Sequence, residues 1–397
     1  MHWHVFHWST VNWIAGVILA AAWFSRIVEA AIGMPHIADI ALPVWDRRPP
    51  TPSGEPRVSI IVPARNEEDD IRATLGRLLA LDYSNYEIIA VDDRSVDGTG
   101  KIMEDVVASD GAARLKVIHI SELPRGWLGK THAMWSAGKV ATGDWLLFTD
   151  ADVLFKPDSL RRAIAYAEAE RADHVVLFPR MIMKRPGEKM MIAFFQALFV
   201  FGHRPWKVAD PKARDHMGVG AFNMVRRSVY DAIGSYQALR MEVLDDMKLG
   251  KVVKNAGFAQ RNVFGEDLIS LRWAKGAFGI VENLTKNFFA VLSFQWPRTV
   301  ASIIGLGFLN LGPFLGVWLA HGWARVPYAI ALLSLFAIYY GMSLRSAVPS
   351  YYFLLHPVST SLFMYTLLRS MIHTFANNGI VWRGTNYPLD ELRKGMV

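Results

Sequence analysis

The sequence predicts an α/β fold with a mainly parallel sheet, flanked by hydrophobic segments long enough to cross a membrane. Three observations support this prediction. Short apolar stretches alternate with helical ones between residues 57 and 289, a pattern typical of a parallel sheet with helices on both faces. Polar motifs follow the predicted strands directly. One apolar segment precedes this region, and two to three follow it, each of membrane-spanning length.

The first element is a hydrophobic segment at about residues 11–28. No Lys or Arg precedes it, whereas three arginines follow between residues 47 and 57. Because basic residues stay on the cytoplasmic side, we expect the N-terminus outside and the following region in the cytoplasm. The missing basic stretch favours an uncleaved anchor over a signal peptide. We assign residues 1–45 to an N-terminal membrane anchor and 46–56, rich in Pro, Ser and Gly, to a linker.

Strands and helices alternate in the region that follows. The expected strands are short and rich in apolar, often β-branched residues, and the expected helices are amphipathic. The strands are predicted at residues 58–62, 86–91, 115–120 and 145–148, and the helices at residues 69–80, 99–108 and 132–140. Since the carboxyl ends of parallel strands meet at one edge, ligands of such sheets bind there.

The strand Trp145–Phe148 is followed by two carboxylates, Asp150 and Asp152. Residues two apart in an extended backbone point the same way, so both side chains can hold one hard divalent cation. Mg²⁺ is commonly bound by one or two carboxylates together with phosphate oxygens of the substrate. A surface turn is the alternative for this pair taken alone.

Two further strands run into polar motifs at the same predicted edge. A nucleoside diphosphate requires hydrogen-bond acceptors for its base and ribose and a cation for its pyrophosphate. Glu67, Asp92 and the Asp150/Asp152 pair supply these parts. The candidate nucleotide-binding residues at these strand ends are Pro63, Ala64, Arg65, Glu67, Asp92 and Asp93.

Four motifs in succession, PARNE, VDDRSVDGT, GWLGKTHAMWSAG and FTDADV, resemble the signatures of family 2 glycosyltransferases with a GT-A fold. The resemblance covers roughly residues 58–289. Taken singly, these motifs have simpler interpretations: Asp97 can cap the following helix, and Lys130 can be a solvated lysine.

The resemblance implies roles for five of these residues. Glu67 and Asp92 would contact uridine, and Lys130 would lie near the base or the diphosphate. Asp150 and Asp152 would hold the ribose and Mn²⁺ or Mg²⁺. The implied fold is a GT-A nucleotide-diphospho-sugar transferase domain.

A later segment, GVGAFNMVRRSVYDAIG, resembles the acceptor side of this family and is followed by Glu242–Leu249. Family members commonly have Glu-Asp there, with the Asp as catalytic base; this chain has Asp245-Asp246, so the base maps to Asp246. An inverting transfer needs a carboxylate to take the proton of the acceptor hydroxyl. Burial and the neighbouring Asp245 would raise the pKa of this base. Two acids at a helix N-terminus are the alternative.

Arg272 and Trp273 resemble the end of the Gln/Arg-x-x-Arg-Trp motif of membrane-bound members, whose leading position does not match here. Trp can cover a sugar or lipid headgroup and Arg can bind phosphate. A tryptophan at the membrane interface is the alternative. We place Asp245, Arg272 and Trp273 on the acceptor or diphosphate side.

Three apolar segments follow, at Thr299–Ala320, Val326–Leu344 and Tyr351–Ile372. We expect the first two to span the membrane. The third contains Pro357, and it spans, re-enters or lies in the interface. Two spanning segments leave the basic tail in the cytoplasm, as the charge rule favours.

The apolar run Met190–Gly202 is too short to span and is either an interfacial helix or a core helix. The expected domains after the linker are a GT-A catalytic domain at 57–289, C-terminal transmembrane segments at 290–382, and a basic tail at 383–397.

Composition narrows the functional classes. Without cysteine, disulfides, thiolate metal sites and cysteine nucleophiles are excluded. The net charge is +7, but the basic residues do not form a stripe interleaved with aromatic residues. Their distribution argues against nucleic-acid binding. Basic residues beside apolar segments favour attraction to anionic lipid headgroups.

The sequence therefore predicts a multi-pass protein of the cell (inner) membrane whose catalytic domain is cytoplasmic. It would be an inverting glycosyltransferase that moves sugar from a nucleotide-sugar, by expectation a UDP-sugar, to a lipid or lipid-linked acceptor. The resemblance is to hopanoid-associated and ceramide-type glycosyltransferases. Three alternatives remain. A processive polysaccharide synthase would need more membrane-spanning segments, and a polyprenyl-phosphate sugar synthase differs only in its acceptor. A non-catalytic scaffold would have lost the Asp motifs.

Overall fold

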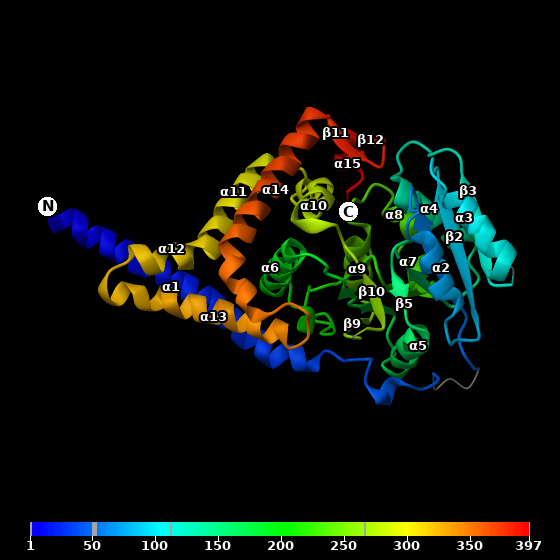
Figure 1. The fold of residues 1–397 in the computed structure, drawn as a ribbon, viewed down its shortest axis with the longest axis horizontal. Helices are drawn as coiled ribbons and strands as arrows, with labels where there is room; N and C mark the ends of the chain where they lie inside the picture. The colour runs from blue at the N-terminus through cyan, green and yellow to red at the C-terminus, as the bar shows by residue number, and fades with distance from the viewer. Residues whose placement is uncertain (1, 50–53, 112, 266, 397) are drawn as a thin grey trace. The chain divides into compact units, whose positions relative to one another are not determined.

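The computed structural model describes residues 2–49, 54–111, 113–265 and 267–396 (Figure 1). The chain forms two compact units, each built from separated stretches of sequence. Unit 1 takes the chain up to His36, Met183–Trp206 and Trp273–Ile380, and unit 2 takes Ile37–Ile182, Lys207–Arg272 and the chain from Val381 onward.

Seven strands form the main sheet of unit 2. They are β1 (Val58–Ala64), β2 (Tyr86–Asp93), β3 (Leu115–Ile120), β4 (Trp145–Phe148), β6 (His174–Leu177), β8 (Asn223–Arg226) and β9 (Gln260–Val263). Their spatial order is β3-β2-β1-β4-β8-β6-β9. Neighbouring strands are parallel except around β8, which runs antiparallel to β4 and β6. The predicted α/β fold with a mainly parallel sheet is confirmed.

The four predicted strands lie where the apolar pattern placed them, and β1 and β2 each continue two residues further, to Ala64 and Asp93. Ile61 and Ile89 on one face of the sheet pack against Ala133 of a helix. Ile60, which points to the opposite face, is equally buried. Burial on both faces explains why β1 is apolar apart from Ser59 and does not alternate between apolar and polar residues.

The helices of unit 2 connect or cover these strands. They are α2 (Ile71–Leu79), α3 (Thr99–Val106), α4 (Gly129–Val140), α5 (Ser159–Ala169), α7 (Arg227–Ala232), α8 (Ser235–Ala238), α9 (Asp245–Asn255) and α15 (Leu389–Lys394). Short helical turns complete the chain at η1 (Met34–His36), η2 (Pro43–Trp45), η3 (Val107–Gly111), η4 (Pro205–Lys207), η5 (Gly307–Leu311), η6 (Gly322–Ala324) and η7 (Ser350–Leu355).

The order of the strands reverses at β1. The chain adds β2 and β3 on one side of β1, and α4 then leads it back to β4 on the other side. In open α/β sheets, the crevice for ligands lies at the carboxyl ends of the strands where such a reversal occurs. The ends of β1 and β4 therefore define where a site is expected.

Two small sheets complete the strands. One has the order β5-β10-β7, from β5 (Leu154–Phe155), β10 (Ile269–Leu271) and β7 (Arg180–Met181), and the other pairs β11 (Gly379–Trp382) with β12 (Thr385–Pro388).

Unit 1 is helical. Its helices are α1 (His2–Gly33), α6 (Pro186–Gly202), α10 (Gly276–Val291), α11 (Trp296–Leu306), α12 (Gly312–Leu319), α13 (Arg325–Ser343) and α14 (His356–Ala376). Helices α1 and α13 lie side by side (Figure 1), and Leu19 and Trp23 share a buried core with Tyr328 and Leu335.

Three helical stretches of the described chain are long and apolar enough to cross a membrane: Thr10–His36, Trp296–Leu319 and Gly322–Ser343. They correspond to the predicted N-terminal segment and to the first two C-terminal ones. The third predicted segment falls on η7 and α14, which do not meet this criterion.

Helix α6 belongs to the core of unit 1. Its residues Ala193, Ala197 and Val200, spaced by four and three along the helix, are buried in the same cluster as Trp23. This packing agrees with the core-helix interpretation of Met190–Gly202.

Candidate active site

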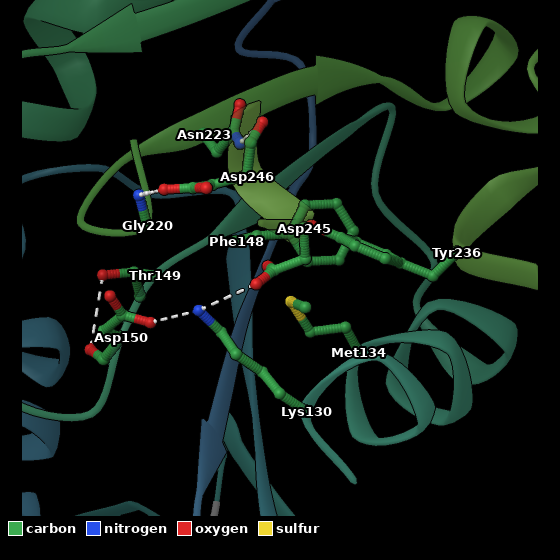
Figure 2. Close-up of a pocket in the computed structure, with 10 residues that line it drawn as sticks. All are labelled: Lys130, Met134, Phe148, Thr149, Asp150, Gly220, Asn223, Tyr236, Asp245 and Asp246. Atoms are coloured by element: carbon green, nitrogen blue, oxygen red, sulfur yellow. Dashed lines mark hydrogen bonds and ion pairs between the residues drawn. The ribbon is translucent and has the colours of Figure 1, made fainter. Parts of the chain in front are cut away.

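A pocket of about 190 Å³ lies at the carboxyl end of β4 (Figure 2). Helix α4, the segment after β4, the segment before β8 and the start of α9 all contribute to it. Its lining residues are Lys130, Met134, Phe148, Thr149, Asp150, Gly220, Asn223, Tyr236, Asp245 and Asp246. The pocket thus brings together four of the predicted site residues, from parts of the sequence more than a hundred residues apart.

Lys130 lies between two of the predicted carboxylates. Its Nζ is 2.8 Å from Asp150 Oδ1 and 3.5 Å from Asp245 Oδ1 (Figure 2). Burial alone would lower the pKa of the Lys130 ammonium, but the carboxylates of Asp150, Asp245 and Asp246 raise it above its usual value. Lys130 is therefore a charged member of the site and not a solvated surface lysine.

Asp245 and Asp246 form the first turn of α9. Asp246 accepts hydrogen bonds from the backbone N–H of Gly220 at 2.9 Å and of Met247 at 2.7 Å. Burial raises the pKa of Asp245 to about 7; Lys130 opposes this shift, and Asp246 and Asp150 add to it. Burial likewise raises the pKa of Asp246. Asp245 and Asp246 therefore lie at a helix N-terminus, as the alternative interpretation predicted, and they also line the pocket.

Asp152 lies next to the pocket in a region of concentrated negative charge. Burial and the carboxylates of Asp150 and Glu67 raise the pKa of Asp152 to about 7. Oxygen ligands and unbalanced negative charge are the features that suit Mg²⁺ or Mn²⁺. In the described part of the chain no group of three or more His, Cys, Asp or Glu side chains is arranged around a metal position, so phosphate and water oxygens would have to complete the coordination.

Two glycines allow the segment before β8 to approach the acids. A Cβ on Gly218 would lie 1.8 Å from the carbonyl oxygen of Asp246, and one on Gly220 would lie 2.5 Å from Asp150 Oδ2. Gly220 O also accepts the backbone N–H of Asp150 at 3.0 Å. The Gly-Val-Gly sequence is therefore required for this packing.

A second, open cleft of about 300 Å³ lies at the end of β1. It is lined by Pro63, Ala64, Arg65, Asp93, Gly129, Lys130, Trp382, Arg383 and Tyr387. Five of these residues were predicted to bind a nucleotide. Lys130 lines both hollows, so the cleft and the pocket adjoin each other.

The remaining acids of the predicted nucleotide set are held by neighbours. Asp92 Oδ2 is 3.0 Å from His119 Nδ1, whose other ring nitrogen is 2.8 Å from Glu104. Asp93 is paired with Arg94 at 2.7 Å. Glu67 is paired with Arg383. Asp92 does not line either hollow of the described chain, whereas Asp93 lines the cleft.

Asp97 is not the N-cap of α3, which is Gly98, but it bonds to the first residue of that helix. Its Oδ1 accepts the backbone N–H of Thr99, the first residue of α3, at 3.0 Å. The same motif therefore supplies both a helix start and, through Asp93, a wall of the cleft.

Arg272 and Trp273 do not line either hollow of the described chain. Arg272 directly follows β10 in unit 2. Trp273 belongs to unit 1, where its ring centroid is 5.0 Å from that of Phe195 and its carbonyl accepts the Asn283 side chain at 2.8 Å.

Trp382, Arg383 and Tyr387 were missed as site residues, because the sequence placed Trp382 at the end of the C-terminal transmembrane region and the other two in the basic tail. A Trp-Arg-Gly turn motif after a hydrophobic segment was the available signal. Local patterns do not show that this turn packs against residues more than 300 positions earlier.

Comparisons with known proteins relate the chain to glycosyltransferases. A sequence model of Glycosyl transferase family 2 matches residues 59–244. The 4,4'-diaponeurosporenoate glycosyltransferase of Staphylococcus haemolyticus is 24% identical over 252 residues, which cover 62% of this chain and 65% of that protein. The undecaprenyl-phosphate 4-deoxy-4-formamido-L-arabinose transferase of Aeromonas hydrophila is 32% identical over 113 residues, covering 28% and 33%. The chain thus spans less than two thirds of the length of these relatives.

Among solved structures, a mannosyltransferase from Pyrobaculum calidifontis in complex with GDP-Man and Mn²⁺ superposes with a TM-score of 0.55 at 20% identity. The superposition covers 92% of this chain and 99% of that one. At this identity the likeness concerns the fold.

Proposed function

Since a model of Glycosyl transferase family 2 matches residues 59–244 and the fold is GT-A, we propose that this chain is a membrane-bound inverting glycosyltransferase of that family. It would move a sugar from a nucleotide-sugar, by preference a UDP-sugar, to a lipid or lipid-linked acceptor. The observation that carries this proposal is the cluster of Asp150, Asp245 and Asp246 around Lys130 at the carboxyl end of β4.

The donor is proposed to bind at the edge where β1 and β4 end. The cleft there presents the cationic side chains of Arg65 and Lys130, which suit a diphosphate. Relatives support a nucleotide-sugar, since the P. calidifontis enzyme was solved with GDP-Man. The residues proposed to hold the donor are Pro63, Ala64, Arg65, Glu67, Asp92, Asp93, Lys130 and Asp150.

We assign Asp150 and Asp152 to a Mg²⁺ or Mn²⁺ ion. Bound there, the ion would offset the charge that raises the pKa of Asp152 and would stabilise the leaving diphosphate. The Mn²⁺ in the P. calidifontis complex supports this assignment.

Asp246 is the proposed general base. The acceptor oxygen would attack the anomeric carbon while the bond from that carbon to the diphosphate breaks, and the hydroxyl proton would pass to the Asp246 carboxylate. The N–H groups of Gly220 and Met247 orient this carboxylate, and its raised pKa improves its strength as a base. Asp245 would position Lys130 through their ion pair.

A lipid or lipid-linked acceptor is proposed for two reasons. The three long apolar helical stretches would keep the enzyme at a membrane, and the two curated relatives are named for a carotenoid acid and for undecaprenyl phosphate. Arg272 and Trp273 remain candidates for the acceptor side. We further propose an inner-membrane location with residues 57–289 in the cytoplasm.

The proposal is tested by measuring UDP or GDP release from a panel of UDP- and GDP-sugars by the detergent-purified protein. Mn²⁺ or EDTA is added, and a membrane lipid extract serves as acceptor. We expect metal-dependent release from one donor, stimulated by lipid and lost in Asp152→Asn and Asp246→Asn.

Asp105→Asn is the matched control, because Asp105 lies on α3 with a side chain 51% exposed and pairs only loosely, at 3.5 Å, with Arg72. Its activity should equal that of the wild type. Folded wild-type protein that neither releases nor binds any nucleotide with Mn²⁺ present would contradict the proposed function.

A further inference from the structure

The C-terminal arm, residues 381–394, packs on unit 2. Leu389 and Leu392 of α15 are buried, as is Tyr387 of β12. Tyr387 Oη accepts the backbone N–H of Gly129, the first residue of α4, at 3.1 Å. The arm is therefore an integral part of this unit and not a solvated tail.

The tip of the arm is a tight turn with an arginine at an unusual position. Arg383 and Gly384 connect β11 to β12, with φ values of +48° and +77°. Two consecutive residues at positive φ characterise the two-residue hairpin turn that matches strand twist. Glycine and asparagine are the usual residues there, so an arginine in this conformation calls for a reason beyond the turn itself.

The turn places the Arg383 guanidinium against the end of β1. It forms an ion pair with Glu67 and donates a hydrogen bond to the carbonyl of Arg65. Arg65 Nη1 in turn donates to Thr385 Oγ1 of the arm at 3.2 Å. One ion pair and two hydrogen bonds thus connect the arm to the end of β1, which was predicted to bind a nucleotide.

The charges of the cleft are suited to an anion. Arg65, Lys130 and Arg383 line it together with a single carboxylate, Asp93. That carboxylate is already paired with Arg94, at 2.7 and 3.0 Å. The side chain of Arg383 is 39% exposed, so it can be reached by a ligand that enters the cleft.

We propose that the C-terminal arm forms one wall of the donor site and that Arg383 binds the diphosphate of the nucleotide-sugar, exchanging Glu67 for it. This inference rests on the proposed function. Without donor, Glu67 neutralises Arg383. When the diphosphate enters, the guanidinium forms bidentate bonds to its oxygens, and Glu67 becomes free to accept hydrogen bonds from the nucleoside. Tyr387 is a positioning residue that holds the start of α4, and with it Lys130, against the cleft.

The test compares the binding of UDP and of uridine to the full-length protein in detergent. Titration calorimetry measures UDP binding, and the weaker binding of uridine is measured by its competition with UDP. In Arg383→Ala we expect UDP to bind at least about tenfold more weakly, the loss expected for a charge-assisted hydrogen bond. Uridine affinity should stay unchanged or increase, because Glu67 is released. Arg383→Lys keeps the charge without the planar fork and should fall between wild type and Arg383→Ala.

Lys394→Ala is the control, since it removes one positive charge from the exposed end of the same arm; its UDP affinity should match the wild type. Unchanged UDP binding in Arg383→Ala, or an equal loss for UDP and uridine, would overturn the role of Arg383 while leaving the proposed function intact. A wild-type protein that binds neither UDP nor GDP would overturn the donor site itself and this inference with it.

Discussion

At the scale of single residues, the site is dominated by an excess of carboxylates. Asp150, Asp245 and Asp246 gather near Lys130, and Asp152 lies close to Asp150; burial raises the pKa of Asp152 and Asp245 to about 7. Such a concentration of like charge costs stability unless a ligand or cation compensates it. The site therefore suits a cation, which would compensate the negative charge, and a ligand group that can donate a proton to a carboxylate.

The first prediction concerns pH. The proposed base Asp246 must be ionised to act. Burial raises its pKa, and burial raises the pKa of the neighbouring Asp245, with which it interacts, to about 7. We expect kcat/KM to rise about tenfold per pH unit up to roughly pH 7 and then to level off. A pH–rate profile between pH 5 and 9 measures this. In Lys130→Gln the rising limb should move to higher pH, because a stabilising ammonium is lost. A flat profile across this range would contradict the assignment.

The second prediction concerns Asp152. A carboxyl whose pKa is raised by folding binds its proton more tightly in the native state, so the metal-free protein loses stability as pH rises from about 4 to about 7. Asp152→Asn removes that cost and should stabilise the metal-free protein by ~1–3 kcal/mol at pH 7.5. Thermal melting with EDTA measures this effect. Mn²⁺ should raise the Tm of the wild type and leave that of Asp152→Asn nearly unchanged; equal Mn²⁺ shifts would argue against a metal at this residue.

The third prediction concerns Gly220. A methyl group there would displace the Asp150 carboxylate, since a Cβ would lie 2.5 Å from its Oδ2. We expect Gly220→Ala to lose most activity, on the order of a hundredfold. Gly76→Ala, on α2 with nothing within 4 Å of the added Cβ, should keep full activity and gain slightly in stability. Nucleotide release measured on both variants shows whether the close approach of Gly220 to Asp150 is needed for activity.

At the scale of elements, short strands and helix starts supply the functional groups. Lys130 is the second residue of α4, Asp245 and Asp246 begin α9, and Asp150 is the second residue after β4. Helix starts carry unpaired N–H groups and favour anions. This explains how α9 holds two neighbouring carboxylates at one end.

The fourth prediction concerns the start of α6. The buried Glu188 accepts the N–H of Lys184 at 2.7 Å and the N–H of Gly276, the first residue of α10, at 2.8 Å. One carboxylate thus holds the starts of two helices. Glu188→Ala should destabilise unit 1 by about 2 kcal/mol, measured as a lower Tm in detergent. Glu122→Ala, at an exposed position, is the control and should melt as the wild type does; a Glu188→Ala variant with unchanged Tm would show that the helix starts are held by other contacts.

Local sequence patterns predicted those strands and helices well whose formation depends on residues close by in the sequence. The strands at 115–120 and 145–148 match β3 and β4 residue for residue, because apolar strands bounded by polar turns depend on near neighbours. Asp150 was singled out from its place after a strand, whereas Asp245 and Asp246 were singled out by their resemblance to a family motif; the structure brings all three beside Lys130. The contacts of Arg383 were not found, because its partner Glu67 lies 316 positions away and no periodicity records that distance.

At the scale of the whole molecule, the chain alternates between the two units. It enters unit 2 after α1, leaves it for α6, returns, leaves again for α10–α14, and returns with the arm. The long apolar stretches all belong to unit 1 or end at its boundary. The acids and cations of the candidate site all belong to unit 2.

The fifth prediction concerns membrane topology. The chain has no cysteine, so single-cysteine variants report the side on which a residue lies. Val96 is 88% exposed in unit 2, and Trp323 is 84% exposed at the start of the apolar stretch Gly322–Ser343. A membrane-impermeant maleimide should label Trp323→Cys in intact spheroplasts and Val96→Cys only after permeabilisation. Labelling in the reverse order would place the catalytic unit outside.

The distance along the chain between Arg383 and Glu67 also bears on how the protein is made. During translation, β1 leaves the ribosome long before the arm does, and α10–α14 are synthesised between them. If the arm forms a wall of the donor cleft as proposed, the cleft lacks that wall until the apolar stretches have been synthesised. A nascent chain would then acquire its full capacity to bind nucleotide only once the arm has been made, which would keep half-made protein from consuming donor.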